Sequence, residues 1–248
     1  MSDKPDSNKI EKPSFDGVIF LPGLLCDERL FAPQVKALEG QYAIEIPDLG
    51  AWSTFEDMSA AVLGNTRFQR FALAGLSMGG ALALNMARWA PDRIERLAIL
   101  DSNPGPDDSA RKSNRRRQIV DAESRGVAEL TRSELAGLYL APQNQTPQLV
   151  ELAVSMAERH GLDVYKRQQN ALMSRQSSRP YLAQIQVPAL VLCGQEDKLC
   201  LPQWHDEMAK EIPNSQLVKI PGAGHLSTLE APGDVNAALS NWLSHRQS

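Results

Sequence analysis

The sequence predicts an α/β protein built on a mostly parallel sheet of about six strands, with helices on both faces. Three observations support this fold class: short apolar runs bounded by turn residues, helical patterns between those runs, and one long helix-prone interval without a strand pattern. The apolar runs are nearly continuous rather than alternating, as in strands buried on both faces of a parallel sheet. Strands that alternate with helices are typical of βαβ units with right-handed crossovers.

The expected elements follow one another regularly along most of the chain. The apolar runs expected to form strands are GVIFLPG from Gly17, YAIEIPD from Tyr42, RFALAG from Arg70, LAILD from Leu97, PALVLCG from Pro188 and SQLVKIPG from Ser215. Helical patterns occupy residues 57–63, 78–89, 202–211 and 235–242. This order predicts a sheet core formed by residues 15–102 and 187–248.

The interval from Asn103 to Gln186 interrupts this alternation. It contains polar, helix-prone sequence with several prolines and no convincing strand pattern. A connection of this length without structure of its own is uncommon, so we expect a helical lid inserted at residues 103–186, over one edge of the sheet. From Ser102 to Pro180 the segment holds 12 Lys and Arg against 9 Asp and Glu, whereas the whole chain has a net charge of −4.

Composition excludes several classes of protein. The apolar share of 42% and the charged share of 23% are those of an ordinary soluble globular protein. The net charge and a pI near 5.6 do not suggest a broad basic face for nucleic acid. No apolar run approaches the roughly 18 residues that span a bilayer, so we expect no membrane association.

The N-terminal residues and the cysteines indicate where the protein resides. Residues 1–14 are polar and lack the apolar segment of a secretory signal, so we expect a disordered lead-in. Cys26, Cys193 and Cys200 are an odd number without metal-ligand spacing, so neither a disulfide framework nor a zinc site is predicted. We therefore expect a cytoplasmic protein.

The stretch Gly75-Leu76-Ser77-Met78-Gly79 fits the pattern G-x-S-x-G between an expected strand and an expected helix. A nucleophilic serine in such a turn adopts an unfavourable backbone conformation that presents its hydroxyl. Side chains two residues away on either side would collide, and the two glycines avoid this. A simple turn is the alternative interpretation, but the strand–turn–helix context favours Ser77 as a nucleophile.

A serine hydroxyl needs a neighbouring base to act as a nucleophile near pH 7. His225 lies in the loop PGAGHLS, just after the last expected strand, where a glycine-flanked side chain can reach inward. We expect it to be the base. The other histidines fit less well: His160 lies in the expected lid, His205 in an expected helix where we predict a solvated side chain, and His245 in the C-terminal tail.

The base in turn needs a carboxylate that fixes its tautomer. Two aspartates follow expected strands between Ser77 and His225 in the sequence. We prefer Asp197, in CGQEDKLCLP, because its loop leads directly into the last βα unit before His225. Asp101 in DSNPG is the alternative, although this sequence is strong turn chemistry and Asp101 could instead satisfy local backbone groups.

An oxyanion hole completes the expected site. The N–H of Met78, directly after the nucleophile, would supply one donor. The second donor is expected from the loop LPGLLCDERLF, where Gly23 allows close approach and the Leu24 N–H would face the substrate oxygen. Leu25 and Cys26 could line the acyl pocket, and we expect Cys26 to pack rather than react.

These motifs together resemble the α/β-hydrolase superfamily, in its branch of serine esterases, lactonases and C–C hydrolases. The similar segments are LPGLLCD, PDL, GLSMGG, CGQEDKLCLP and GAGHLS, which span most of residues 15–242. The resemblance implies a catalytic triad of Ser77, His225 and Asp197, an oxyanion hole from the Leu24 and Met78 amides, and a lid between the fourth and fifth strands.

The sequence also departs from the pattern of the superfamily. Leu-Pro-Gly stands where many relatives have His-Gly, so a supporting histidine is missing. The usual first two strands are absent, which leaves about six. GAWSTFEDM replaces the R-G-H-G-x-S run that commonly follows PDL, so the resemblance does not define that wall of the pocket.

The expected reaction is hydrolysis of a small carboxylic ester, lactone or thioester through an acyl-enzyme, without a metal or organic cofactor. Two alternatives remain: a C–C bond hydrolase of the meta-cleavage type or cofactorless lyase, and a hydrolase-like ligand receptor that is not an enzyme. The stretch ARKSNRRRQ, with Arg115, Arg116 and Arg117, could bind a substrate carboxylate, a CoA phosphate or an acyl carrier protein. We favour the simpler interpretation, a solvated helix face.

Overall fold

The protein forms a six-stranded sheet in which every neighbouring pair of strands is parallel. This architecture comes from a computed structural model that describes residues 15–244, so the lead-in expected at residues 1–14 lies outside the described residues. The strand order is β2-β1-β3-β4-β5-β6, and the expected fold class is confirmed. The strands are β1 Gly17–Leu21, β2 Ile44–Glu45, β3 Phe71–Leu76, β4 Ile94–Leu100, β5 Ala189–Gly194 and β6 Ser215–Ile220.

The apolar runs predicted as strands are buried because both faces of the sheet are covered. β1, β3 and β5 are buried along their whole length. Successive side chains of a strand point to opposite faces, so Phe20 of β1 joins one apolar cluster and Leu21 joins the other. This two-sided core explains why the runs do not alternate between apolar and polar residues.

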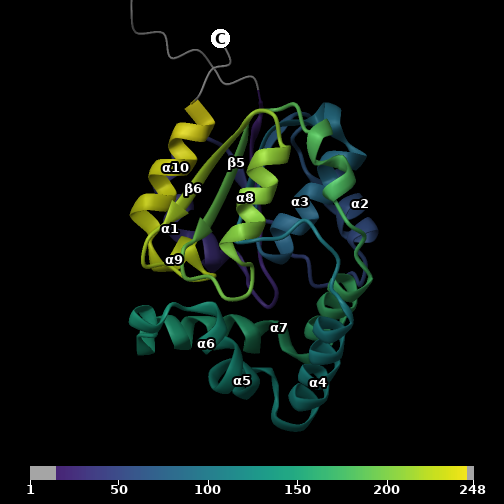
Figure 1. Ribbon diagram of the computed structural model, residues 1–248, viewed down its shortest axis with the longest axis vertical. Coiled ribbons are helices and arrows are strands. Elements are labelled where there is room, and N and C mark those ends of the chain that lie inside the picture. The colour runs from purple at the N-terminus through teal and green to yellow at the C-terminus, as the bar shows by residue number, and fades with distance from the viewer. Residues whose placement is uncertain (1–14, 245–248) are drawn as a thin grey trace, which may run out of the picture.

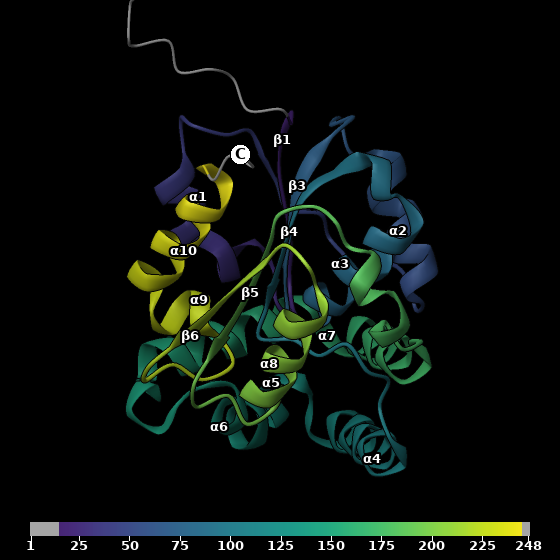
Figure 2. The ribbon, with the colours of Figure 1, turned by 45° about the horizontal axis from the view of Figure 1, so that its top comes forward.

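Helices cover both faces of the sheet (Figures 1 and 2). One face carries α1 Ala32–Leu38, α9 Ser227–Glu230 and α10 Pro232–Ser244, and the other carries α2 Phe55–Asn65, α3 Met78–Trp89 and α8 Pro202–Glu211. α2, α3, α8 and α10 correspond to the four expected helical patterns. The short α1 was not predicted from the sequence.

A third group of helices lies between β4 and β5 in the sequence. It comprises α4 Ser109–Arg125, α5 Val127–Leu130, α6 Ala136–Tyr139 and α7 Pro147–Ser174, with a π-helical turn over Thr131–Leu135 between α5 and α6. We call these helices the helical layer. Figure 1 shows them gathered at the end of the sheet toward which the strands run. The domain boundaries expected from the sequence, including a lid at 103–186, remain predictions.

Local sequence signals begin the two long helices of this layer. The Asp108 side chain accepts a hydrogen bond from the Arg111 N–H at 2.8 Å, which caps the N-terminus of α4. Thr146 caps α7 in the same way, and Pro147 occupies its first position. Gly161, with φ 73°, interrupts α7, so the two halves of α7 take different directions.

No helix within residues 15–244 has both the length and the apolar composition needed to cross a lipid bilayer.

Candidate active site

Ser77 lies in a strained turn between β3 and α3. Its backbone has φ 58° and ψ −114°, a conformation that L-residues rarely adopt. Glycine is required on both sides of it. A Cβ atom on Gly75 would overlap the backbone of Gly79, and a Cβ atom on Gly79 would overlap the carbonyl of Leu21. The motif read from the sequence therefore corresponds to a real steric requirement.

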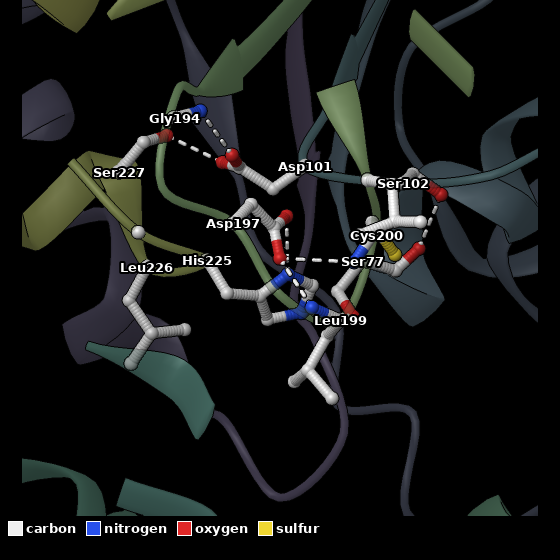
Figure 3. Close-up of polar contacts among 12 residues, drawn as sticks. Ser77, Asp101, Ser102, Gly194, Asp197, Leu199, Cys200, His225, Leu226 and Ser227 are labelled. Atoms are coloured by element: carbon white, nitrogen blue, oxygen red, sulfur yellow. Dashed lines mark hydrogen bonds and ion pairs between the residues drawn. The ribbon is translucent and has the colours of Figure 1, made fainter. Parts of the chain in front are cut away.

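His225 lies beside Ser77 although the two residues are 148 positions apart in the chain. The distance between His225 Nε2 and Ser77 Oγ is 2.8 Å (Figure 3). Two features hold the histidine: its N–H donates to the Tyr139 carbonyl at 2.9 Å, and the Tyr139 ring stacks on the imidazole with centroids 6.0 Å apart. The helical layer thus helps to position this loop.

Asp197 completes a chain of three side chains. Its Oδ2 lies 2.8 Å from His225 Nδ1, and its Oδ1 accepts hydrogen bonds from the N–H groups of Leu199 and Cys200 at 2.8 and 2.9 Å. Asp197 and His225 are each 2% exposed. These donors stabilise the buried carboxylate and leave Oδ2 to the imidazole, so the structure brings Ser77, His225 and Asp197 together.

The two amides expected to bind an oxyanion are near the serine. Met78 is the first residue of α3, where N–H groups have no acceptor inside the helix. No acceptor for the Leu24 N–H exists among the described residues. Gly23 lies against Ser77, since a Cβ atom on Gly23 would be 3.4 Å from Ser77 Cβ.

Ser77 and His225 line a cavity of about 310 Å³, within the size range of small-molecule sites. Leu24, Cys26 and Met78 line it too, whereas Leu25 does not. The expectation that Leu25 faces the pocket is therefore wrong. Leu25 has φ 57° and its N–H donates to Gln168 of α7 at 2.9 Å, so it is buried beneath the helical layer.

Residues 18–238 match the sequence model of the Alpha/beta hydrolase family. The chain belongs to this family. Two comparisons extend the match. The protein named "Putative carbamate hydrolase RutD" from Serratia proteamaculans is 27% identical over 234 residues, which cover 87% of this chain and 86% of the relative. The structure of a malate-bound esterase from Thermogutta terrifontis has a TM-score of 0.83 and 29% identity, and the match covers 91% of this chain and 88% of the esterase.

An enol-lactonase from Burkholderia xenovorans shares the fold, with a TM-score of 0.81 over 92% of both chains and 23% identity. The alpha/beta hydrolases similar to this chain thus bear the names of several hydrolytic activities. The family membership makes hydrolysis the supported type of reaction, whereas the names of the relatives do not agree on one substrate.

The site also includes Asp101, which the sequence offered as the alternative acid, and Ser102, which was not predicted. Asp101 and Ser102 directly follow β4 and connect the loops that carry the three site residues (Figure 3). Asp101 Oδ1 accepts from the Gly194 N–H at 2.8 Å, and Oδ2 accepts from the Ser227 hydroxyl. The Ser102 hydroxyl donates to the Ser77 carbonyl at 2.7 Å. Within residues 15–244 no hydrogen bond joins Asp101 to the imidazole. Asp101 instead links the end of β5, before the Asp197 loop, to the start of α9, after the His225 loop.

Asp101 is fully buried and has φ 44°. Burial raises the pKa of its carboxyl well above the ordinary value, and the negative charge of Asp197 raises it further. Hydrogen bonds from Ser227 and Gly194 oppose this shift only in part. The carboxyl thus binds a proton more readily than an exposed aspartate does.

The prediction that His205 is solvated is wrong. Its side chain is 0% exposed, and Nε2 accepts a hydrogen bond from the Ser102 N–H at 2.9 Å. That acceptor role places the proton on Nδ1, which faces the Leu201 carbonyl at 3.3 Å. Burial lowers the pKa of His205 to about 4, so it is neutral at pH 7. His160 lies with Nε2 3.1 Å from the Cys26 carbonyl, and His245 lies outside the described residues.

One group of side chains has the composition of a metal site. Asp197, Cys200 and His225 offer ligand atoms within 4.8 Å of one another. However, burial raises the pKa of the Cys200 thiol, so it is protonated rather than a thiolate ligand. Asp197 and His225 already bind each other, and the group therefore fits a proton-transfer chain better than a metal site. Burial also raises the pKa of Cys26 and Cys193 to about 12.

Proposed function

We propose that this alpha/beta hydrolase is a serine hydrolase that cleaves a small carboxylic ester, lactone or thioester through an acyl-enzyme. The observation that carries the proposal is the continuous contact from Ser77 Oγ to His225 Nε2 and from His225 Nδ1 to Asp197, each at 2.8 Å. An imidazole held between a serine hydroxyl and a buried carboxylate is the arrangement that activates a serine for acyl transfer.

In the proposed mechanism, Ser77 Oγ attacks the substrate carbonyl carbon while His225 Nε2 takes the hydroxyl proton. Asp197 keeps the other imidazole proton on Nδ1 and stabilises the imidazolium that forms. The Leu24 and Met78 N–H groups donate to the negative oxygen of the tetrahedral intermediate. His225 then protonates the leaving alcohol, thiol or lactone oxygen as the bond to the carbonyl carbon breaks.

Deacylation repeats these steps with water. His225 takes a proton from a water molecule, the resulting hydroxide attacks the acyl-enzyme carbonyl, and the proton returns to Ser77 Oγ as the acid leaves. The cavity of about 310 Å³ suits a small acyl group.

A panel of esters, thioesters and lactones, extended with carbamates because one relative bears the name of a carbamate hydrolase, tests the proposal. We expect turnover of at least one class by the wild-type protein, none by Ser77→Ala, and rapid labelling of Ser77 by a fluorophosphonate. Two carbonyl fragments from a β-diketone, with no turnover of any ester, would favour C–C hydrolysis. Failure to label Ser77 and to turn over any substrate would favour a receptor.

A further inference from the structure

Three arginines line the cavity that contains Ser77 and His225. Arg111 and Arg115 come from α4, and Arg175 directly follows α7. No aspartate or glutamate is among the described residues that line this cavity. The wall contributed by the helical layer is therefore cationic where it meets the proposed catalytic residues.

One carboxylate, Asp107, partly balances this charge from behind the wall. It forms ion pairs with Arg115 and, at 3.1 Å, with Arg175, and its side chain is 0% exposed. Burial acts to raise the pKa of Asp107, but Arg115 and Arg175 outweigh it, so the pKa lies below its ordinary value. The three guanidiniums and one carboxylate leave an excess positive charge at the cavity.

Arg111 is the clearest part of that excess. No carboxylate pairs with it within residues 15–244. Its guanidinium stacks over the Trp204 ring at 4.6 Å, and Nη2 donates to the Leu199 carbonyl at 2.8 Å. These contacts fix its position without neutralising its charge. A partly buried cation of this kind is costly unless an anion pairs with it.

Arg115 is also held in place with donor capacity to spare. Its Nε contacts Asp107, and Nη1 donates to Gln169 Oε1 at 2.7 Å, while Gln169 itself donates to the Tyr165 hydroxyl at 2.6 Å. Among the described residues no acceptor faces Nη2 of Arg115. A guanidinium held this way still offers the N–H donors of Nη2 to a carboxylate.

The neighbouring arginines of α4 do not line the cavity, so the cationic wall is specific to certain positions of this helix. Arg117 pairs with Asp121 at 2.5 Å and with Glu134 at 2.6 Å, its side chain is 48% exposed, and it does not line the cavity. Arg116 is exposed and does not line the cavity either. The solvated helix face expected from the sequence thus exists for Arg116 and Arg117, but not for Arg115.

We infer that the substrate carries a carboxylate, held by Arg111 and Arg115, close to the bond that is cleaved. The inference rests on the proposed function, and it narrows the substrate class to small esters of dicarboxylic acids or of other acids with a free carboxylate. Because Arg111, Arg115 and Ser77 line the same cavity of about 310 Å³, the carboxylate and the cleaved bond would belong to one small molecule.

A pair of matched esters tests the inference: monoethyl succinate, and ethyl succinamate, in which an uncharged amide replaces the carboxylate. We expect the wild-type kcat/KM to be at least tenfold higher for the charged ester. The ratio of the two kcat/KM values should fall about tenfold in Arg111→Gln and in Arg115→Gln. Arg117→Gln, on the same helix, should keep the wild-type ratio.

Equal turnover of both esters by the wild-type protein would overturn the inference. An equal loss of preference for the charged ester in Arg117→Gln and in Arg111→Gln would also overturn it. If Arg115→Gln does not fold because it disturbs Asp107, Arg111→Gln carries the test alone. A loss of the proposed function is distinguishable: Ser77 is then unlabelled by a fluorophosphonate and neither ester reacts. In that case calorimetry with succinate and with succinamide tests the inference. The wild-type protein should bind succinate more tightly than succinamide, and Arg111→Gln should weaken the binding of succinate.

Discussion

Two buried aspartates end neighbouring strands at the same edge of the sheet, and their contacts are different. Asp197 follows β5 and directs Oδ2 to His225, while two backbone N–H groups hold Oδ1. Asp101 follows β4 and directs one oxygen to the Gly194 N–H at the end of β5 and the other to the Ser227 hydroxyl at the start of α9. The comparison teaches that burial at a strand end does not identify the acid that orients a histidine, because the same residue type can serve to hold the loops.

The largest effect that sharpens this comparison is expected from Asp197→Asn. The amide would place its N–H₂ or its oxygen against His225 Nδ1 and would no longer fix the tautomer that accepts the Ser77 proton. We expect kcat/KM to fall by roughly 10³–10⁴-fold, measured on the best ester of the panel. An unchanged circular dichroism spectrum would show that the fold is intact, and a loss below tenfold would break the distinction between the two aspartates.

His205 accepts a hydrogen bond from the N–H of Ser102, the neighbour of Asp101. We expect it to affect how the free energy of unfolding depends on pH. The folded protein keeps His205 neutral down to about pH 4, whereas the unfolded chain protonates near pH 6.5. The unfolded state therefore binds more protons between these values, and the free energy of unfolding should decrease as the pH falls from about 6.5 to about 4.

In His205→Gln this contribution to the pH dependence is absent, so the stability difference between wild type and variant should shrink as the pH falls through that window. Urea unfolding at several pH values measures it. A difference that stays constant from pH 7 to pH 4 would contradict the buried, neutral state of His205.

Asp101→Asn should have a much smaller effect on turnover than Asp197→Asn. We expect less than a tenfold decrease in kcat/KM, because the amide keeps an oxygen for the Gly194 N–H and does not touch the imidazole. The pKa of Asp101 is raised in the folded state, so the folded protein holds this proton more tightly than the unfolded chain does. The contribution of Asp101 to the free energy of unfolding therefore decreases as the pH rises above about 4. Asparagine does not titrate, so the variant lacks this decrease.

Thermal unfolding of the wild type and Asp101→Asn between pH 4 and pH 8 checks the expected pH dependence of stability. The variant should gain stability relative to the wild type as the pH rises. A decrease in kcat/KM as large as that of Asp197→Asn would instead show that both carboxylates act on His225.

The smallest effect is expected from Ser102→Ala, which removes the hydrogen bond from its hydroxyl to the Ser77 carbonyl. One such bond contributes about 1 kcal/mol to stability, and kcat/KM should fall only a few-fold. Ser174→Ala is the control for the loss of a serine hydroxyl away from the site, because within residues 15–244 the Ser174 hydroxyl bonds to backbone carbonyls of its own helix. Equal losses in the two variants would mean that Ser102 does not position the serine.

The fold and the neighbourhood of Ser77 could be predicted because their signals are local. Continuous apolar runs mark strands buried on both sides, and two glycines around a serine mark a turn that excludes larger side chains. The position of His225 in a glycine-flanked loop just after the last expected strand also made it a reasonable neighbour of Ser77. The catalytic roles of these residues remain proposals.

Other features depend on contacts between distant segments and could not be predicted. The burial of His205 requires Ser102, which is 103 positions away, and the positive φ angles of Leu25 and Asp101 carry no glycine or asparagine signal. The arginines of α4 are an intermediate case. A spacing of four places Arg111 and Arg115 on one helix face, but only the packing of the helical layer shows that this face turns toward the cavity.

Hydrogen bonds also join the helical layer to the loop that carries His225. The Tyr139 carbonyl accepts from the N–H groups of both His225 and Leu226, and the Glu230 carboxylate accepts from Ala141, Asn144 and Gly224. Because of these hydrogen bonds, a displacement of α6 would also displace the imidazole of His225 from Ser77. The imidazole and the α6 side of the helical layer are therefore expected to move together.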